Sequence, residues 1–227
     1  MKYADLSIND KHIISEHYDD VYFDMDNGLD ETKHVFLDRN GIPSILKEKN
    51  EFTIVETGFG TGLNFLALLN EYEIEKLNTT INYYSVEKYP IEKGELKKVL
   101  KVWEDLKFKD ELASIYPSKN GMHKIKMHKN ITLHLYIGEL NDFLPLLESG
   151  VDCWFLDGFA PDKNPDMWSD TLFKKMSEIT HPKGTFSSFT AAGVVKQGLR
   201  KHGFFVKRYP GFGNKRHMIG GFLDDKL

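Results

Sequence analysis

The feature that most constrains the fold is a glycine-rich turn between a strand-like and a helix-like segment. Residues 52–56 (FTIVE) are mostly apolar, glycines follow at 58, 60 and 62, and residues 63–69 then place apolar side chains on one broad face. Glycine lets the backbone turn sharply and approach a ligand closely, because it has no Cβ. This order of strand, turn and helix is typical of the ligand-binding edge of a parallel α/β sheet.

The same alternation of strand and helix continues along the chain. We expect strands at 81–86, 131–137, 151–156 and 184–189, helices at 91–106, 165–179 and 191–202, and a closing strand pair at 204–209 and 216–222. Such alternation predicts a mostly parallel sheet covered on both faces, with the antiparallel pair at its edge.

The N-terminal region has a different pattern. Residues 18–45 alternate apolar and polar side chains around two Asn-Gly pairs, which predicts β-hairpins. The lysine-rich stretch 119–130 is expected to be a flexible loop. We therefore predict an N-terminal β-rich extension at 1–50 and an α/β domain at 51–227.

Composition excludes several classes of protein. With 41% hydrophobic residues the chain can build one sizeable core, yet no stretch approaches the roughly 18 apolar residues of a membrane span, and the N-terminus lacks the apolar region of a signal peptide. A single cysteine, Cys153, excludes an intramolecular disulfide, and the nine histidines form no metal-binding pattern. We expect a cytoplasmic protein without metal, and a monomer.

The distribution of charge is more informative than its sum. The net charge is −4, but residues 179–223 contain no acid and eight basic residues, so the rest of the chain carries −12. A protein polarised in this way can present a basic face to a polyanion such as RNA. The alternative is an ordinary solvated surface. The basic residues expected near RNA are Arg200, Lys201, Lys207, Arg208, Lys215 and Arg216.

Two acids beside the predicted site narrow the choice of cofactor. Position 63, where a dinucleotide-binding turn needs its third glycine, is Leu63, and no P-loop is present. Glu56, before the turn, suits a cationic amino group, and Glu87, at the end of the second strand, suits ribose hydroxyls. A nucleoside that carries an amino acid meets both demands, which points to S-adenosylmethionine. The alternative is a tight turn without a ligand.

Asp157 is the residue we expect nearest the chemistry, because it follows the apolar strand 151–156. A carboxylate there can accept a hydrogen bond from an amine and orient its lone pair, which suits N-methylation. The alternative is that Asp157 only caps an Asp-Gly turn. Phe159 and Trp168 are candidates for stacking on a nucleobase, although core packing is the commoner role of such side chains.

Three segments together resemble one family. They are ETGFGTGLNFL (56–66), WFLDGFAPDKNPDMW (154–168) and SFTAAGVVKQGLRKHGFFVKRYPGFGNKRHMIGG (188–221). They resemble the methyltransferase module of the bifunctional MnmC enzymes and its stand-alone relatives, which modify the wobble uridine of tRNA. The segment FDMDNGLDETKHVFLDRNG (23–41) is also similar to the region that precedes the glycine turn in that family.

The resemblance implies a class I (Rossmann-like) S-adenosylmethionine-dependent methyltransferase fold. It further implies methyl transfer to the amine of 5-aminomethyl(-2-thio)uridine in the anticodon of tRNA, without the FAD-dependent oxidase module that follows in the bifunctional members. By position, it implies cofactor contacts at Gly58, Phe59, Gly60, Gly62, Asn64, Glu87 and Glu139, the reactive acid at Asp157, and a tRNA-facing basic segment at 211–216.

Two positions depart from the family pattern. Glu139 stands where an aspartate is expected, and His217 follows Lys215-Arg216 where related chains often carry an acid. Three other functions stay open from the residues alone. They are an aminopropyltransferase, an N-methyltransferase of a small amine, and a tRNA-binding module without catalysis.

Overall fold

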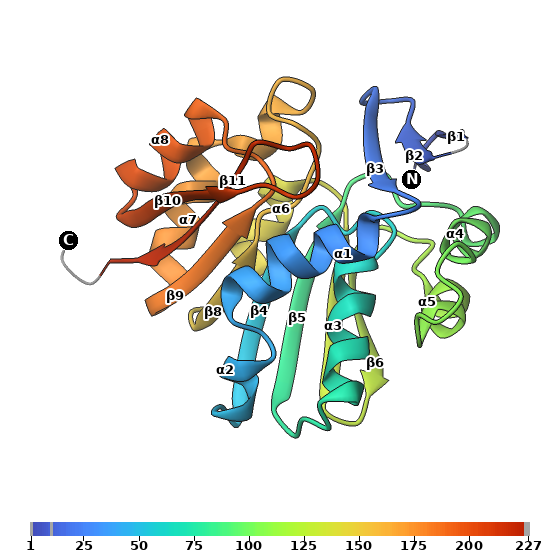
Figure 1. The fold of residues 1–227 in the computed structure, drawn as a ribbon, viewed down its shortest axis with the longest axis horizontal. Helices are drawn as coiled ribbons and strands as arrows, with labels where there is room; N and C mark the ends of the chain where they lie inside the picture. Colours follow the sequence, from blue (N-terminus) through green and yellow to red (C-terminus); the bar gives the residue numbers. More distant parts are fainter. Residues whose placement is uncertain (1, 10, 225–227) are drawn as a thin grey trace.

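The computed structural model describes residues 2–9 and 11–224, and an eight-stranded sheet forms its centre (Figure 1). The strands lie in the order β10-β11-β9-β8-β4-β5-β7-β6. Five of them run parallel to one another, whereas β11 is antiparallel to β9 and to β10, and β6 is antiparallel to β7. The predicted parallel sheet with an antiparallel pair at its edge is confirmed. The bounds are β4 (Glu51–Thr57), β5 (Thr80–Glu87), β6 (Gly121–His128), β7 (Ile131–Ile137), β8 (Val151–Phe155), β9 (Thr180–Ser188), β10 (Phe204–Pro210) and β11 (His217–Leu223).

The strand order reverses beside β4. The chain moves outward from β4 through β5 to β7, and then crosses to β8 on the other side of β4. Connections therefore leave the carboxyl ends of β4 and β8 in opposite directions. In a parallel sheet such a reversal opens a crevice at the carboxyl edge, which is where ligands bind.

Two hydrophobic cores lie on opposite faces of the sheet. Successive strand residues point to opposite faces, so Ile54 packs in one core and Val55 in the other. The first core is covered by α3 (Leu63–Ile74), α4 (Lys93–Leu100) and α5 (Lys109–Ile115). The second is covered by α6 (Leu140–Phe143), the 3-10 turn η3 (Leu144–Leu146), α7 (Asp170–Ile179) and α8 (Gly193–Lys201). Burial on both faces explains why the central strands are nearly continuous apolar runs.

The N-terminal region is only partly β-structure. A small sheet contains β1 (Leu6–Ile8), β2 (His12–Ser15) and β3 (Asp20–Asp24). The prediction of hairpins is wrong for the residues that follow, because the Asn27-Gly28 pair begins helix α1 (Gly28–Thr32) rather than a turn. The chain then continues through the π-helical turn η1 (Lys33–Leu37), the 3-10 turn η2 (Asp38–Asn40) and α2 (Ser44–Lys47).

The physical reason for this error is burial. Three consecutive apolar residues, 35–37, are all buried, and the Phe36 ring lies 5.4 Å from that of Phe155 on β8. A half-exposed hairpin would leave every second residue in solvent. These residues belong to the same core as α3, and the boundary that we predicted at residue 50 stays a prediction.

Three other segments also differ from expectation. The predicted helix 91–106 ends at Leu100, and α5 follows separately. The predicted loop at 119–130 contains β6, an edge strand whose exposed lysines alternate with more buried residues, a common protection against edge pairing. The predicted helix 165–179 is instead a 3-10 turn, η4 (Pro165–Trp168), followed by α7. Ser169 caps the first turn of α7, because its hydroxyl accepts a hydrogen bond from the Leu172 N–H at 3.3 Å.

The described part of the chain holds no helix that combines the length and apolarity of a membrane crossing. Nor does it hold a group of three or more His, Cys, Asp or Glu side chains placed to bind a metal ion.

Candidate active site

A cavity of about 650 Å³ lies at the carboxyl edge of the sheet. Its wall takes residues from the loop after each central strand, including Gly58–Gly60, Glu87, Gly138–Glu139 and Asp157–Phe159. The volume falls within the range of about 300–1,000 Å³ that is usual for small-molecule sites. The sequence analysis assigned residues from all four loops to one site, and the structure brings these loops together.

The glycine turn packs tightly against the loop after β8. Gly58 has φ +89°, and a Cβ at this position would lie 2.8 Å from the carbonyl oxygen of Asp157. The Thr57 hydroxyl donates to the same oxygen at 2.9 Å. Gly60 contacts the Tyr22 ring, which a Cβ would approach to 3.2 Å. A larger side chain at Gly58 would therefore push the turn away from the loop that carries Asp157, and one at Gly60 would press against Tyr22.

Gly62 has a structural rather than a binding position. It does not line the cavity, and it precedes α3 with φ +77°. A Cβ there would lie 2.8 Å from Leu112 in the core. Phe59, by contrast, lines the cavity although it is largely buried. The prediction that Gly62 contacts a ligand is not supported by its location.

Glu87 forms part of the cavity floor, where two backbone N–H groups orient its carboxylate. Gly60 N–H donates to one oxygen at 2.7 Å and Tyr89 N–H to the other at 2.9 Å. Burial raises the pKa of Glu87 to about 7, although these hydrogen bonds oppose the shift. Each oxygen keeps acceptor capacity for a hydroxyl group, so the geometry suits a vicinal diol.

Glu139 lies at the cavity rim, after β7. Its side chain is 57% exposed and its Oε1 lies 2.9 Å from Lys88 Nζ. It lines the cavity, as we expected, but the ion pair with Lys88 holds it at the solvent boundary.

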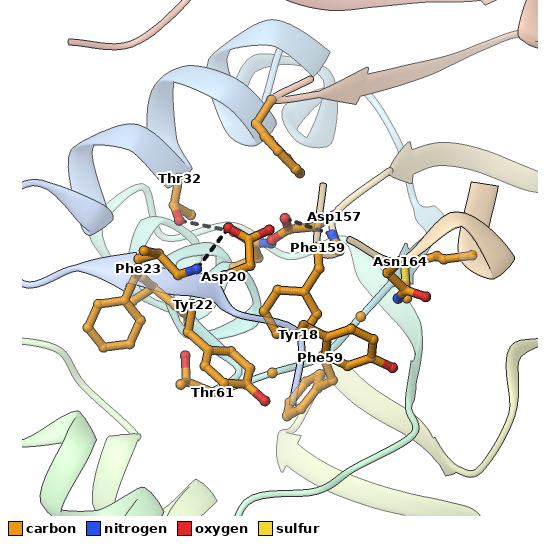
Figure 2. A pocket seen from close by; sticks show the side chains of 18 of the residues that line it. Tyr18, Asp20, Tyr22, Phe23, Thr32, Phe59, Thr61, Asp157, Phe159 and Asn164 are labelled. Carbon is orange, nitrogen blue, oxygen red and sulfur yellow. Dashed lines mark hydrogen bonds between the residues drawn. The ribbon is translucent and has the colours of Figure 1, made fainter. Parts of the chain in front are cut away.

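Asn64 organises a buried hydrogen-bond network beneath the cavity. Its Nδ2 donates to Glu56 Oε1 at 2.8 Å and to Asp157 Oδ2 at 2.7 Å, and its Oδ1 accepts from the Thr32 hydroxyl at 3.0 Å. Asn64 lines the cavity, and so do Thr32 of α1 and Asp157, both of which Figure 2 shows. The side chains of Asn64 and of its three partners thus each have a hydrogen-bond partner within the network, which makes the network rigid.

Glu56 lies behind Asn64 and does not line the cavity. It is 1% exposed and also accepts from the Ser85 hydroxyl at 2.7 Å. Burial raises its pKa to about 8. The sequence analysis placed Glu56 against the amino group of the cofactor, and this placement is corrected. The side chain instead orients Asn64, which in turn holds Asp157.

Asp157 lies just after the carboxyl end of β8 and is partly exposed to the cavity. Besides the bond from Asn64, its Oδ1 accepts from the Gly158 N–H at 3.0 Å. Burial raises the pKa of Asp157 to about 7; Asn64 and Lys215 oppose the shift, and Glu31 adds to it. A carboxyl group with a pKa near neutrality can accept a proton and release it again.

An aromatic wall from the N-terminal sheet closes one side of the cavity. Figure 2 shows the rings of Tyr18, Tyr22 and Phe159 grouped together, with Thr32 and Asp157 above them in the view. Tyr18 stacks on Phe159 with centroids 4.5 Å apart, and Tyr22 meets Phe159 edge-on at 5.1 Å. Asp20 Oδ2 accepts from the Ala160 N–H at 2.8 Å and joins β3 to the loop after β8. The sequence offered no signal for these long-range contacts beyond the alternation of aromatic residues.

The predicted RNA-facing residues fall into two groups. The loop between β10 and β11 (211–216), dark red in Figure 1, lies near α1. Four of its residues, 212–215, line the cavity, Lys215 among them. Arg216, Lys207 and Arg208 are exposed on the same hairpin. Arg200 and Lys201 are elsewhere, because α8 runs back from the carboxyl edge and ends beside the start of β10.

The assignment of Trp168 needs correction, whereas those of Arg200 and Lys201 to the RNA-facing surface stay predictions. Arg200 donates to the Val206 carbonyl at 3.2 Å and Lys201 pairs with Asp170 at 2.7 Å, both away from the cavity. Trp168 is 4% exposed in the core, and its Nε1 donates to the Phe159 carbonyl at 3.0 Å. Trp168 therefore supports Phe159 from behind and is not available for stacking on a base.

The cavity is strongly acidic. Seven carboxylates line it against two lysines, Lys88 and Lys215, so its potential favours cations over phosphate-rich ligands. The carboxylates are Asp20, Asp24, Glu31, Glu87, Glu139, Asp157 and Asp166. Of these, the sequence analysis identified Glu87, Glu139 and Asp157, and it missed Glu31 on α1.

Known proteins share this architecture along nearly the whole chain. The chain is 46% identical to the tRNA 5-methylaminomethyl-2-thiouridine biosynthesis bifunctional protein MnmC of Marinomonas sp., covering 92% of this chain and 32% of that protein. It is 42% identical to the protein of the same description from Vibrio campbellii, covering 100% of this chain and 36% of that protein. The chain thus spans about a third of the length of these relatives.

A solved structure confirms the fold. The crystal structure of MnmC2 from Aquifex aeolicus superimposes with a TM-score of 0.77 at 22% identity, covering 98% of this chain and 71% of that one. The predicted class I (Rossmann-like) methyltransferase fold is therefore confirmed. Residues 104–224 match the model of a family described as S-adenosyl-L-methionine-dependent methyltransferase, which also confirms the predicted cofactor. This chain belongs to that family of S-adenosyl-L-methionine-dependent methyltransferases.

Proposed function

We propose that the chain methylates the primary amine of 5-aminomethyl(-2-thio)uridine at the wobble position of tRNA, giving the 5-methylaminomethyl form. The observation that carries the proposal is an acidic cavity, suited to a sulfonium and an amine, whose rim bears a basic loop suited to RNA. The relatives named for biosynthesis of 5-methylaminomethyl-2-thiouridine in tRNA support it, because they align along 92–100% of this chain.

The residues of the cavity fit S-adenosylmethionine, which supplies an electrophilic methyl group on a positively charged sulfur. Glu87 would bind the ribose hydroxyls, and Gly58 and Gly60 leave space for the backbone to approach the methionine part. Glu139 would lie on the adenine side, at the rim. The excess of carboxylates in the wall attracts both positive charges of this ligand.

Asp157 would act on the substrate amine. An amine attacks only through a free lone pair, so an arriving ammonium must first lose a proton. The Asp157 carboxylate accepts a hydrogen bond from the nitrogen, turns its lone pair toward the methyl group, and takes the proton or passes it to solvent. Overall, a bond would form between the nitrogen and the methyl carbon, the bond from that carbon to sulfur would break and leave the neutral thioether S-adenosylhomocysteine, and one proton would be released. Asn64 keeps the carboxylate in place during this step through its 2.7 Å hydrogen bond.

The RNA would approach along the β10–β11 hairpin. Three basic side chains are exposed on this hairpin, those of Lys207, Arg208 and Arg216. No acidic residue between 179 and 223 offsets their charge. Phe189, Phe212 and Phe159 line the cavity and offer apolar surface to a base that has left its stack. That the protein is a monomer and acts in the cytoplasm stays a prediction.

The test is a methyl-transfer assay with S-adenosylmethionine labelled in its methyl group. The substrates are tRNA that carries 5-aminomethyluridine at the wobble position, the same tRNA with an unmodified uridine, and the free 5-aminomethyluridine nucleoside. We expect label only in the first tRNA, recovered by mass spectrometry as 5-methylaminomethyluridine. Equal methylation of the free nucleoside would indicate a small-amine methyltransferase, and label in another nucleoside would refute the assignment.

A further inference from the structure

Glu31 brings a second carboxylate to the cavity that Asp157 lines. It lies on α1 and its side chain is only 21% exposed. Glu31 and Asp157 both line the cavity, so the two carboxyl groups share one space. The adjacent residue, Thr32, donates to Asn64, which donates to Asp157. One short chain of hydrogen bonds therefore holds α1 in a constant position relative to the reactive acid.

The group that Glu31 binds in this structure is chemically informative. Glu31 Oε1 accepts from Lys215 Nζ at 2.6 Å, and Lys215 comes from the β10–β11 loop. The end of a lysine side chain is a primary ammonium on a methylene group. The amine of a 5-aminomethyluridine is the same functional group. The chain thus places its own alkylammonium where an alkylammonium substrate would enter.

The pair is also arranged so that it can be exchanged. The Lys215 side chain is 53% exposed, and a pair this open to water contributes little to stability. The hairpin that carries Lys215 has other contacts with the helical segment. The His34 ring nitrogen lies 3.2 Å from the carbonyl oxygen of Pro210 at the end of β10, and the His34 and Phe212 ring centroids are 5.9 Å apart. Lys215 can therefore leave Glu31 for a phosphate while the hairpin stays in place.

We propose that Glu31 is the substrate-recognition carboxylate, which binds the incoming aminomethyl group in place of the Lys215 ammonium while Lys215 transfers to an RNA phosphate. This inference rests on the proposed function and deepens it. Glu31 selects the charged amine, whereas Asp157 faces the nitrogen during transfer. The exchange of one ammonium for another leaves Glu31 paired throughout, which avoids an uncompensated carboxylate in the cavity.

The test compares E31Q with D30N, a matched control with the same loss of charge on an exposed neighbour that does not line the cavity. Affinities are measured for two tRNAs, one with 5-aminomethyluridine and one with unmodified uridine at the wobble position. We expect the wild-type chain and D30N to bind the aminomethyl tRNA about tenfold more tightly than the unmodified tRNA, since one hydrogen bond to a charged group typically contributes an effect of about this size. We expect E31Q to bind both tRNAs equally. Unchanged discrimination by E31Q would overturn the inference.

A double-mutant cycle separates substrate recognition from simple pairing with Lys215. If Glu31 binds the amine, E31Q raises KM for the aminomethyl tRNA by about tenfold even in a K215M background. If Glu31 serves only as the partner of Lys215, E31Q has no further effect once Lys215 is absent, and the inference is wrong. Methylation of the aminomethyl tRNA by the wild-type chain is measured in parallel, so failure of the proposed function is recognised separately.

Discussion

Replacing Asp157 by asparagine is expected to lower kcat by about 10²–10³-fold, within the range for loss of a general acid–base group. Asparagine keeps the shape of the side chain, but it has one acceptor oxygen in place of two, so it retains only one of the hydrogen bonds from Asn64 and from the Gly158 N–H. It cannot carry the negative charge that accepts a proton from the amine. The affinity for S-adenosylmethionine should therefore change by less than about threefold, because Asp157 acts on the nucleophile.

The pH dependence gives a second readout of the same variant. Burial raises the pKa of Asp157 to about 7, so the carboxyl group is protonated below that pH and cannot accept from the amine. Wild-type log kcat should fall more steeply below pH 7, with a slope approaching about two, because the amine and Asp157 both gain protons. D157N should keep a single slope of about one. The control is D166N, an exposed carboxylate at the cavity wall. Near-normal turnover by D157N would contradict the assignment.

Replacing Glu87 by glutamine is expected to weaken binding of S-adenosylmethionine by about 100-fold or more. The carboxylate accepts from the N–H groups of Gly60 and Tyr89 on its two oxygens, and a glutamine would turn its NH₂ toward one of these donors. The variant also loses a charge-assisted hydrogen bond to a ribose hydroxyl, and each such bond contributes about 1.5–3 kcal/mol. At saturating cofactor, kcat should return toward that of the wild-type chain.

The matched control for this prediction is E139Q, measured by the same calorimetric titration. Glu139 is 57% exposed and paired with Lys88, so solvent screens its interactions and its loss should weaken binding by less than about fivefold. An equal loss in both variants would mean that the ribose does not bind at Glu87.

The sequence predicted the sheet and the loops at its edge, because these depend on local patterns. Apolar strand segments followed by glycine or acidic residues are visible without tertiary information, so Gly58, Glu87 and Asp157 were found. The resemblance of three segments to one family added Asn64, which no spacing rule would have selected.

Other parts of the site depend on contacts between distant segments. Glu31 reaches the cavity because α1 packs beside α3, and Tyr18 because β3 is joined to the loop after β8 through Asp20. The sequence analysis placed Glu56 in contact with the cofactor, since the sequence cannot show that Asn64 lies between Glu56 and the cavity. Arg200 has the right charge, but the direction of α8 takes it to the opposite edge.

The most direct test of the central claim is a crystal structure of the chain with S-adenosylmethionine. We predict that the ribose hydroxyls bind Glu87 and that the methyl group points into the open space between Asp157 and Glu31. A ligand bound outside this cavity, or one with its methyl group directed away from Asp157, would contradict the account.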